Sequence, residues 1–168
     1  MTSSGGLPAE LLSAGSDCGR LLAARGETVA VAEGSAGGLI STALLATPGA
    51  SAFYLGGAVI YTMNALDGLL TGRDERPPML RGASKPWATH LARGARLHMG
   101  ATWGIGEGGA AGPKGNPYGD PAGHGWVAVS GPTEVARHIL TGDAERHRNM
   151  VAFAIAGLQL LAETIEEG

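Results

Sequence analysis

The sequence is poor in charged residues and in cysteine. Charged residues make up 16% of the 168 positions, and the formal net charge is -3. This balance provides no broad basic surface, so we do not expect the protein to bind nucleic acid. Cys18 is the single cysteine and excludes an internal disulfide, and no apolar run is long enough to cross a bilayer. Because residues 1–10 also lack the basic and apolar regions of a signal peptide, we expect a cytoplasmic protein with no membrane contact.

Metal-binding patterns are missing as well. The five histidines show no H-x-x-x-H spacing, and one cysteine cannot form a C-x-x-C pair. We therefore expect no metal ion and no cofactor. His124 is the histidine that has a candidate role: it ends a glycine-rich segment, where it would act as an acid or base or else lie in solvent.

What remains is the composition of one folded domain. Hydrophobic residues make up 44% of the chain, and a chain of this length can bury a sizeable core. We expect a single domain over residues 1–168. The low charge, together with Trp87 and Met99 on the expected exterior, predicts a homodimer or larger homo-oligomer.

Short apolar runs alternate with stretches of helical periodicity. Helices are expected over residues 8–26, 37–49, 84–98 and 143–165, and strands over residues 28–33, 53–62, 101–106, 125–131 and 134–140. In the third helix, Ser84 is the expected N-cap, and Asp143 has that role in the last. Helices interleaved with apolar strands predict an α/β fold, a three-layer α/β/α sandwich with a mixed sheet.

Glycine is unusually frequent, with 29 residues that cluster rather than repeat. The densest cluster spans residues 104–125. It has the glycine content of a flexible linker, but it also contains Glu107, Lys114, Asp120 and His124. This chemical variety favours a functional loop.

Residues 32–38, 61–66 and 108–113 contain three motifs that, in this order, resemble those of the CinA C-terminal domain family, which includes nicotinamide mononucleotide deamidases. The family motif Ala-Glu-Ser-Cys-Thr-Gly-Gly corresponds to Ala-Glu-Gly-Ser-Ala-Gly-Gly at residues 32–38. The motif Tyr-Ser-Asn-Glu-Ala-Lys corresponds to residues 61–66, and Thr-Gly-Ile-Ala-Gly-Pro to residues 108–113. The resemblance covers nearly the whole chain from about residue 8 onward.

Three polar positions of these motifs are substituted. Gly34 replaces the serine, Leu66 replaces the lysine that could serve as its base, and Gly108 replaces a threonine. Amide hydrolysis by a nucleophilic hydroxyl needs both the hydroxyl and a base. The hydroxyl of Ser35 remains, one position further along, and it would need a base other than lysine.

The resemblance and the strand ends together define a candidate site. Catalytic candidates are Ser35, Tyr61, Glu33 and Glu107; ligand-binding candidates are Gly37, Gly38, Gly109, Ala110, Gly112 and Arg148. Ligands of open α/β sheets gather at the carboxyl ends of strands, so we expect a crevice there with residues 114–123 as its mobile rim.

Some of these candidates have alternative roles. The Glu33 carboxylate would either take part in the chemistry or only fix its own turn by accepting backbone hydrogen bonds, and Glu107 has the same two possibilities. Arg148 corresponds to an arginine in the family's last helix. It would contact a phosphate or carboxylate group, or else be exposed and pair with Glu145 or with a partner subunit.

Two functions follow from the resemblance and the substitutions. One is an amidohydrolase of the nicotinamide-nucleotide deamidase type with altered motif positions. The other is a catalytically inactive relative that binds a nucleotide-like ligand or acts as an oligomeric partner.

Overall fold

The computed structural model describes residues 6–70 and 76–168. Within these residues, five strands form one mixed sheet in the order β2-β1-β3-β4-β5. The strands are β1 (Val29–Glu33), β2 (Tyr54–Val59), β3 (Trp103–Gly109), β4 (His124–Ser130) and β5 (Val135–Leu140). The central β1 runs parallel to β2 and β3, whereas β4 is antiparallel to β3 and to β5.

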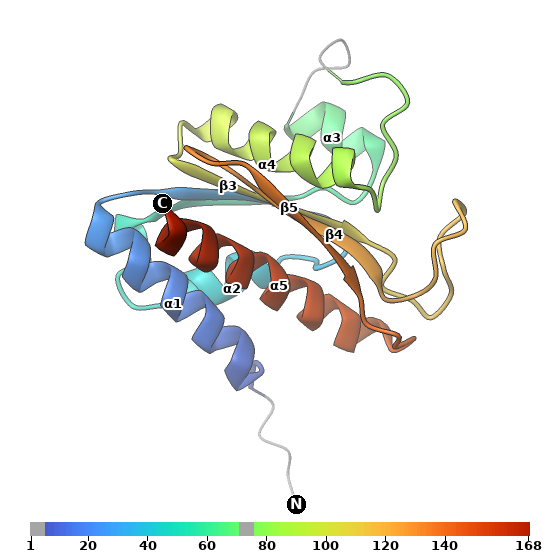
Figure 1. Ribbon diagram of the computed structural model, residues 1–168, viewed down its shortest axis with the longest axis horizontal. Coiled ribbons are helices and arrows are strands. Elements are labelled where there is room, and N and C mark those ends of the chain that lie inside the picture. Colours follow the sequence, from blue (N-terminus) through green and yellow to red (C-terminus); the bar gives the residue numbers. More distant parts are fainter. Residues whose placement is uncertain (1–5, 71–75) are drawn as a thin grey trace, which may run out of the picture.

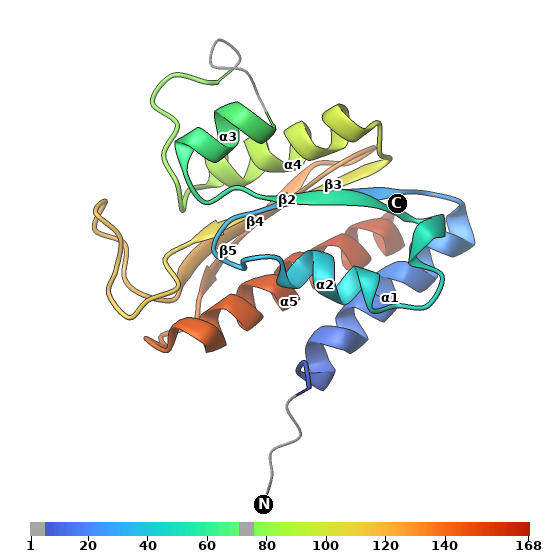
Figure 2. The ribbon, with the colours of Figure 1, turned by 180° about the vertical axis from the view of Figure 1, so that it is seen from behind.

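Helices cover both faces of the sheet. On one face lie α1 (Ala9–Arg25), α2 (Leu39–Leu45) and α5 (Arg146–Glu167), and on the other lie α3 (Met63–Leu69) and α4 (Lys85–Met99) (Figure 1). The view from behind shows the same two layers around the sheet (Figure 2). The predicted three-layer α/β/α architecture with a mixed sheet is therefore confirmed.

The alternation of side chains along β1 divides the core between the two faces. Val29 and Val31 pack with residues of α1, α2 and α5, while Ala30 and Ala32 pack against the α3 and α4 side. All five residues of β1 are buried. A buried parallel strand of small and β-branched residues explains why the sequence shows a continuous apolar run there.

Alternate glycines of β3 account for part of the glycine excess. A Cβ atom on Gly104 or Gly106 would collide with the backbone carbonyls of Ala92 or Ala88 in α4. On Gly108 it would collide with the indole of Trp87. These glycines let α4 lie very close to the sheet, so their main role is in packing.

The ends of the helices test the sequence prediction. Gly26 ends α1 in the left-handed conformation, with φ of 65°, and Ser84 Oγ accepts a hydrogen bond from Trp87 N at 3.3 Å. Both caps are as predicted. In contrast, α5 begins after Glu145 and not after Asp143. Asp143 instead accepts a hydrogen bond from Glu145 N at 2.8 Å, which organises the turn before the helix.

Other expectations about α3 and α4 need correction. The short helix α3 was not predicted, because its seven residues are too few to show a clear period. Trp87 is not on the exterior: its side chain is 4% exposed and belongs to the core. Trp87 therefore gives no support to an oligomer.

Candidate functional site

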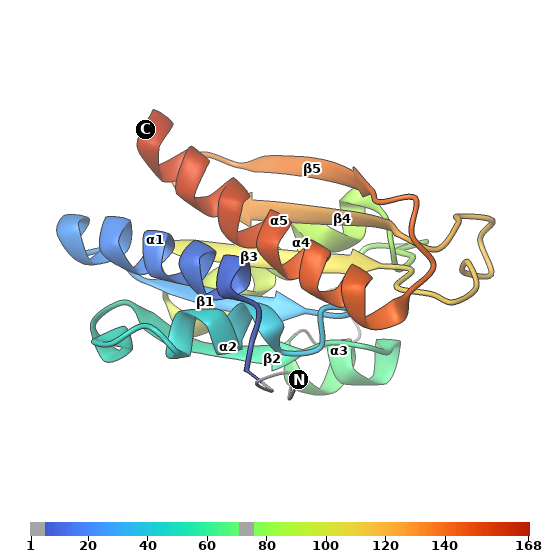
Figure 3. The ribbon, with the colours of Figure 1, turned by 90° about the horizontal axis from the view of Figure 1, so that it is seen from below.

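The carboxyl ends of β1 and β3 and the segment after β2 surround a cavity of about 240 Å³. The loop between β3 and β4 extends past the sheet at this end, where α5 begins (Figure 3). The cavity is lined by Ser35, Tyr61, Gly109, Ala110, Ala111, Gly112, Lys114, Gly115, Asn116, Pro117 and Arg146. The structure thus brings five of the candidate residues, Ser35, Tyr61, Gly109, Ala110 and Gly112, together with residues 114–117 of the predicted rim.

Two further hollows, one smaller and one larger, continue from this cavity toward α3 and α4. One, of about 70 Å³, shares Ser35, Tyr61 and Gly109 with the cavity and reaches Trp87. The other, of about 340 Å³, has Trp87, Met63 and Tyr118 in its walls. Ser35 therefore lies between a polar region near Arg146 and an apolar, partly aromatic region.

Glu33 does not line the cavity. Its side chain is 0% exposed, and its carboxylate turns toward the start of α2. Oε1 accepts from the backbone N–H groups of Gly38 and Ile40 at 2.8 and 3.1 Å, and Oε2 accepts from both Ser41 N and Ser41 Oγ at 2.9 Å. Glu33 thus fixes the turn and the first turn of α2.

Glu107 is the partner of Glu33 in the register of β1 and β3, but its carboxylate is bonded differently. It is also 0% exposed. Oε2 accepts from the backbone N–H groups of Gly34 and Ala36 at 3.0 and 2.8 Å, and Oε1 accepts from the hydroxyl of Ser35. Among the candidate residues that line the described cavity, Ser35 is therefore the one whose hydroxyl forms a hydrogen bond with a carboxylate.

Burial raises the pKa of Glu107 to about 7. The negative charge of Glu33 raises that pKa further, while the hydrogen bonds from Ser35, Ala36 and Gly34 lower it. A carboxyl group with a pKa near neutrality can both take and return a proton at physiological pH.

The cationic end of the cavity is formed by Arg146 and Lys114. Arg146 donates from Nη1 to the carbonyl of Gly112 at 2.6 Å and from Nη2 to Tyr61 Oη at 3.1 Å. These bonds hold the guanidinium at the cavity wall. The sequence showed a basic turn here, but its spacing alone could not tell which arginine faces the site.

Arg148, the arginine selected from the sequence, has a different position. Its Nε donates to Asp143 Oδ2 at 2.7 Å, and its Nη2 donates to Asp143 Oδ1 at 3.2 Å. The residue is exposed and is not among the residues that line the cavity. The expected ion pair is present, but its partner is Asp143 and not Glu145.

The backbone N–H groups of three ligand-binding candidates, Gly37, Gly38 and Ala110, donate within the protein and are not free to bind an anion. Gly37 N donates to the carbonyl of Gly34 at 3.1 Å, Gly38 N to Glu33, and Ala110 N to the carbonyl of His124 at 2.8 Å. Gly37 and Gly38 lie outside the cavity lining. The charged side chains at the cavity, rather than these amides, provide its attraction for an anion.

Apolar groups occupy the space at two of the three positions where the resemblance implies a substituted polar residue. Leu66 is fully buried and packs in the same cluster as Trp87, and the indole of Trp87 occupies the space beside Gly108. A Cβ atom on Gly34 would lie 3.0 Å from the carbonyl oxygen of Ile60. Apolar groups thus surround positions 66 and 108, whereas backbone carbonyl oxygens lie beside Gly34.

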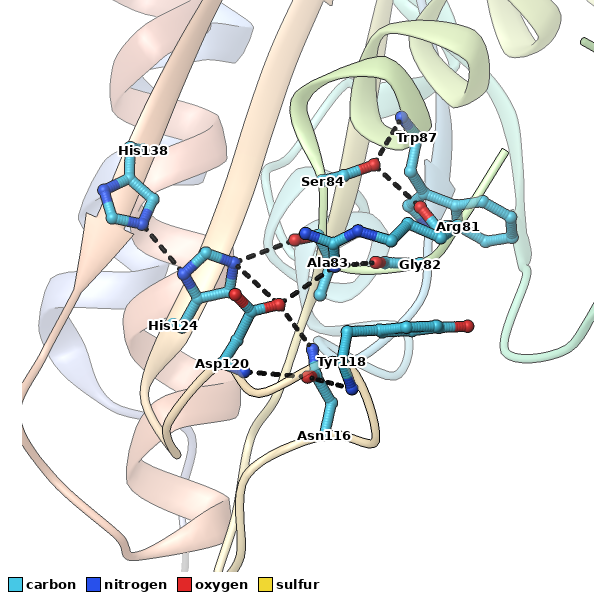
Figure 4. Close-up of polar contacts among 10 residues, drawn as sticks. All are labelled: Arg81, Gly82, Ala83, Ser84, Trp87, Asn116, Tyr118, Asp120, His124 and His138. Carbon is cyan, nitrogen blue, oxygen red and sulfur yellow. Dashed lines mark hydrogen bonds and ion pairs between the residues drawn. The ribbon is translucent and has the colours of Figure 1, made fainter. Parts of the chain in front are cut away.

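His124 is buried, at 9% exposed, and does not lie in solvent. Its Nε2 is 2.8 Å from the carbonyl oxygen of Ala83, and its Nδ1 is 2.9 Å from His138 Nε2 (Figure 4). Since a carbonyl only accepts, Nε2 carries the proton that is donated to Ala83. Nδ1 then accepts from His138, so His124 links β4 and β5 to the segment before α4.

Hydrogen bonds of Asp120 and Asn116 hold the loop between β3 and β4. Asp120 accepts from Asn116 Nδ2 at 2.8 Å and from Arg81 Nη1 at 3.0 Å, and Asn116 Oδ1 accepts from the backbone of Tyr118 and Asp120 (Figure 4). Because it joins two neighbouring strands of one sheet, the loop is not a linker between domains. These bonds connect the predicted rim to Arg81 in the segment before α4.

The described residues can be searched for a metal-binding group and for a membrane-spanning helix, neither of which the sequence predicts. Among residues 6–70 and 76–168, no group of three or more histidine, cysteine, aspartate or glutamate side chains is placed to hold a metal ion. No helix in the same residues has the length and apolar character needed to span a membrane.

Comparison with protein families gives a match over most of the chain. A model described as the CinA C-terminal domain matches residues 12–165. A CinA-like protein of Anaeromyxobacter sp. (strain K) is 41% identical over 143 residues, which are 84% of this chain and 35% of that protein. A CinA-like protein of Acidobacterium capsulatum is 43% identical over 131 residues, or 76% of this chain and 31% of that protein. The chain spans about a third of the length of these two relatives.

Solved structures have the same arrangement of elements. A competence-damaged protein (CinA) superfamily protein from Klebsiella pneumoniae superposes with a TM-score of 0.86 at 24% identity, covering 94% of this chain and 99% of that chain. The competence/damage inducible protein CihA from Agrobacterium tumefaciens superposes with a TM-score of 0.86 at 25% identity, covering 96% and 98% of the two chains. At such identities the comparison supports the shared fold.

Proposed function

The chain belongs to the CinA C-terminal domain family, and from this we propose that it is an amidohydrolase of the nicotinamide-nucleotide deamidase type. The observation that carries the proposal is the position of the Ser35 residue. It forms part of the wall of a cavity whose other side carries Arg146 and Lys114, and its hydroxyl is bonded to a buried carboxylate. An amide next to a negatively charged group would fit these two features.

The two ends of the cleft suit the two ends of such a substrate. Arg146 and Lys114 attract a phosphate group, and the hollow beside Trp87 and Tyr118 offers apolar surface for a flat ring. Ser35 lies between them, where the amide of a substrate held at both ends would come.

The test is ammonia release from nicotinamide mononucleotide, compared with nicotinamide riboside, which lacks the phosphate. We expect the nucleotide to be preferred. Arg146→Gln should raise the KM for the nucleotide about 10-fold to 100-fold, because a charged hydrogen bond contributes about 1.5–3 kcal/mol. Arg148→Gln is the matched control and should leave KM unchanged. Equal effects of the two variants would contradict the assignment of Arg146.

A second candidate is a catalytically inactive relative that binds a nucleotide-like ligand. It is favoured by the apolar groups around Leu66 and Gly108, which stand where the resemblance implies polar groups in the family motifs. Calorimetric titration with nicotinamide mononucleotide distinguishes the two candidates: binding without any ammonia release identifies the inactive relative.

We also propose that the protein is a homodimer or larger homo-oligomer. With Trp87 buried, the support comes from the free edge of β2, where Leu55 and Val59 are exposed and no charged side chain occurs. Light scattering at micromolar concentration tests this. A mass of 16.9 kDa, that of one chain, would contradict it.

A further inference from the structure

We propose that Ser35 and Glu107 form a nucleophile–base pair that takes over the roles of the motif serine and lysine, which this chain lacks at positions 34 and 66. The inference rests on the proposed amidohydrolase function for its substrate. Its test below uses a probe that needs no nucleotide substrate, so that the two proposals can fail separately.

The geometry of the pair supports this assignment. Ser35 Oγ donates its hydrogen to Oε1 of Glu107, and Ser35 is also part of the walls of two neighbouring hollows. The other oxygen of Glu107 is held by Gly34 N and Ala36 N, so the carboxylate cannot turn away from the hydroxyl. A base fixed beside a hydroxyl at a cavity wall is the arrangement that serine nucleophiles need.

The chain contains a second serine–glutamate hydrogen bond, which has a different setting. Ser41 Oγ donates to Glu33 Oε2 at 2.9 Å, but neither residue lines the cavity. The two pairs have the same chemical groups and are neighbours in the fold. Position at the cavity therefore distinguishes a reactive pair from a structural one.

The reaction balances with these two groups and water. The Ser35 oxygen attacks the amide carbon and its proton passes to Glu107; the carbon–nitrogen bond then breaks, and Glu107 returns the proton to the leaving nitrogen, which departs as ammonia. Water next attacks the acyl carbon, giving its proton to Glu107. The carbon–oxygen bond to Ser35 breaks, Ser35 recovers the proton, and the products are ammonia and a carboxylic acid.

Covalent labelling with diisopropyl fluorophosphate tests the pair directly. This probe forms a bond to the oxygen of an activated serine and loses fluoride, and mass spectrometry of peptides locates the label. We expect labelling of Ser35 in the wild-type chain at a rate well above that of the exposed Ser51. The rate should rise with pH around neutrality as Glu107 ionises, beside the negative charge of Glu33.

Glu107→Gln removes the base while keeping the hydrogen bonds. The amide oxygen can accept from Gly34 N and Ala36 N, and the amide nitrogen can donate to Ser35 Oγ, so that the direction of that one bond reverses. Labelling should fall by about 100-fold to 10,000-fold, the usual contribution of a general base. The variant should also lose the pH dependence. Ser41→Ala is the matched control and should be labelled at the wild-type rate.

The outcomes separate the two proposals. Ser35 labelling that depends on Glu107, without ammonia release from nicotinamide mononucleotide, supports the pair and argues against that substrate. Ammonia release that persists in Ser35→Ala overturns the pair and leaves the amidohydrolase proposal standing. The pair is also overturned if Ser35 reacts no faster than Ser51, or if Glu107→Gln, folded by circular dichroism, is labelled at the wild-type rate.

Discussion

Glu33 and Glu107 are two carboxylates in matching positions of neighbouring parallel strands, and their surroundings give them different roles. Both are fully buried, and both lie near the carboxyl ends of their strands, where they are partners in the register. Glu33 accepts hydrogen bonds from the first residues of α2, including three backbone N–H groups. Glu107 accepts hydrogen bonds from two backbone N–H groups and from the hydroxyl of Ser35, a residue of the cavity wall. The comparison teaches that the donors around a buried acid, more than its burial or position, decide what it can do.

The difference comes from the direction in which the chain leaves each strand. After β1 the chain turns through residues 34–38 into α2, and this turn passes between the two carboxylates. Its first residues donate to Glu107 and its last residue, Gly38, donates to Glu33. One turn is therefore fixed by two acids, and Ser35 is held by the acid of the neighbouring strand.

The largest expected effect concerns the dependence of stability on pH. The pKa of Glu107 is raised from 4.5 to about 7, so its stabilising contribution is complete below pH 4.5 and is lost as the pH rises through 7. Relative to Glu107→Gln, which does not titrate, the wild type should lose about 3 kcal/mol of unfolding free energy across this interval. Urea unfolding of both proteins from pH 4.5 to 8.5 measures the difference. A difference independent of pH would show that the pKa of Glu107 is not raised.

The next effect is expected at Glu33. Both oxygens of Glu33 accept from backbone N–H groups, so the amide nitrogen of Glu33→Gln would face a donor in either orientation. Leaving such a buried donor unpaired costs about 1–3 kcal/mol. Urea unfolding at pH 8 should therefore show Glu33→Gln to be less stable than the wild type, and Glu107→Gln to be no less stable. The reverse order would contradict the assignment of the two roles.

The sequence predicted the parts of this arrangement that depend on local patterns. The strands, the cap at Gly26 and the cap at Ser84 follow from periodicity and turn chemistry, and the meeting of the β1 and β3 ends follows from the fold that the motifs imply. The sequence could not show that Glu107 is bonded to Ser35, because the two residues are 72 positions apart and only the sheet register brings them together. The choice between Arg146 and Arg148 likewise depended on where α5 begins.

A smaller effect is expected at Gly34, which lies on the Glu107 side of the turn. A Cβ atom here would lie 3.0 Å from the carbonyl oxygen of Ile60 and 3.4 Å from that of Glu107, so Gly34→Ala requires a shift of the backbone. Overpacking of this kind costs about 1–2 kcal/mol. The shift would also lengthen the bond from Gly34 N to Glu107. We expect labelling of Ser35 to slow, while a Gly68→Ala control, where a Cβ atom meets no neighbour within 4 Å, should leave the rate unchanged.

The smallest expected effect on stability is that of Ser41→Ala, which we compare with Ser35→Ala. Ser41→Ala removes one hydroxyl donor from Glu33, but the backbone N–H of Ser41 still donates to the same oxygen, so the loss should be about 0.5–1.5 kcal/mol, that of one ordinary hydrogen bond. Ser35→Ala removes the one hydrogen-bond donor that residues 6–70 and 76–168 provide to Oε1 of Glu107. Because that bond lowers the pKa of Glu107, its loss should raise the pKa further and shift the pH dependence of stability to higher pH. Ser41→Ala should leave that dependence in place. If both variants move it equally, the two carboxylates titrate as one unit, and the difference between Glu33 and Glu107 on which the proposed pair depends does not exist.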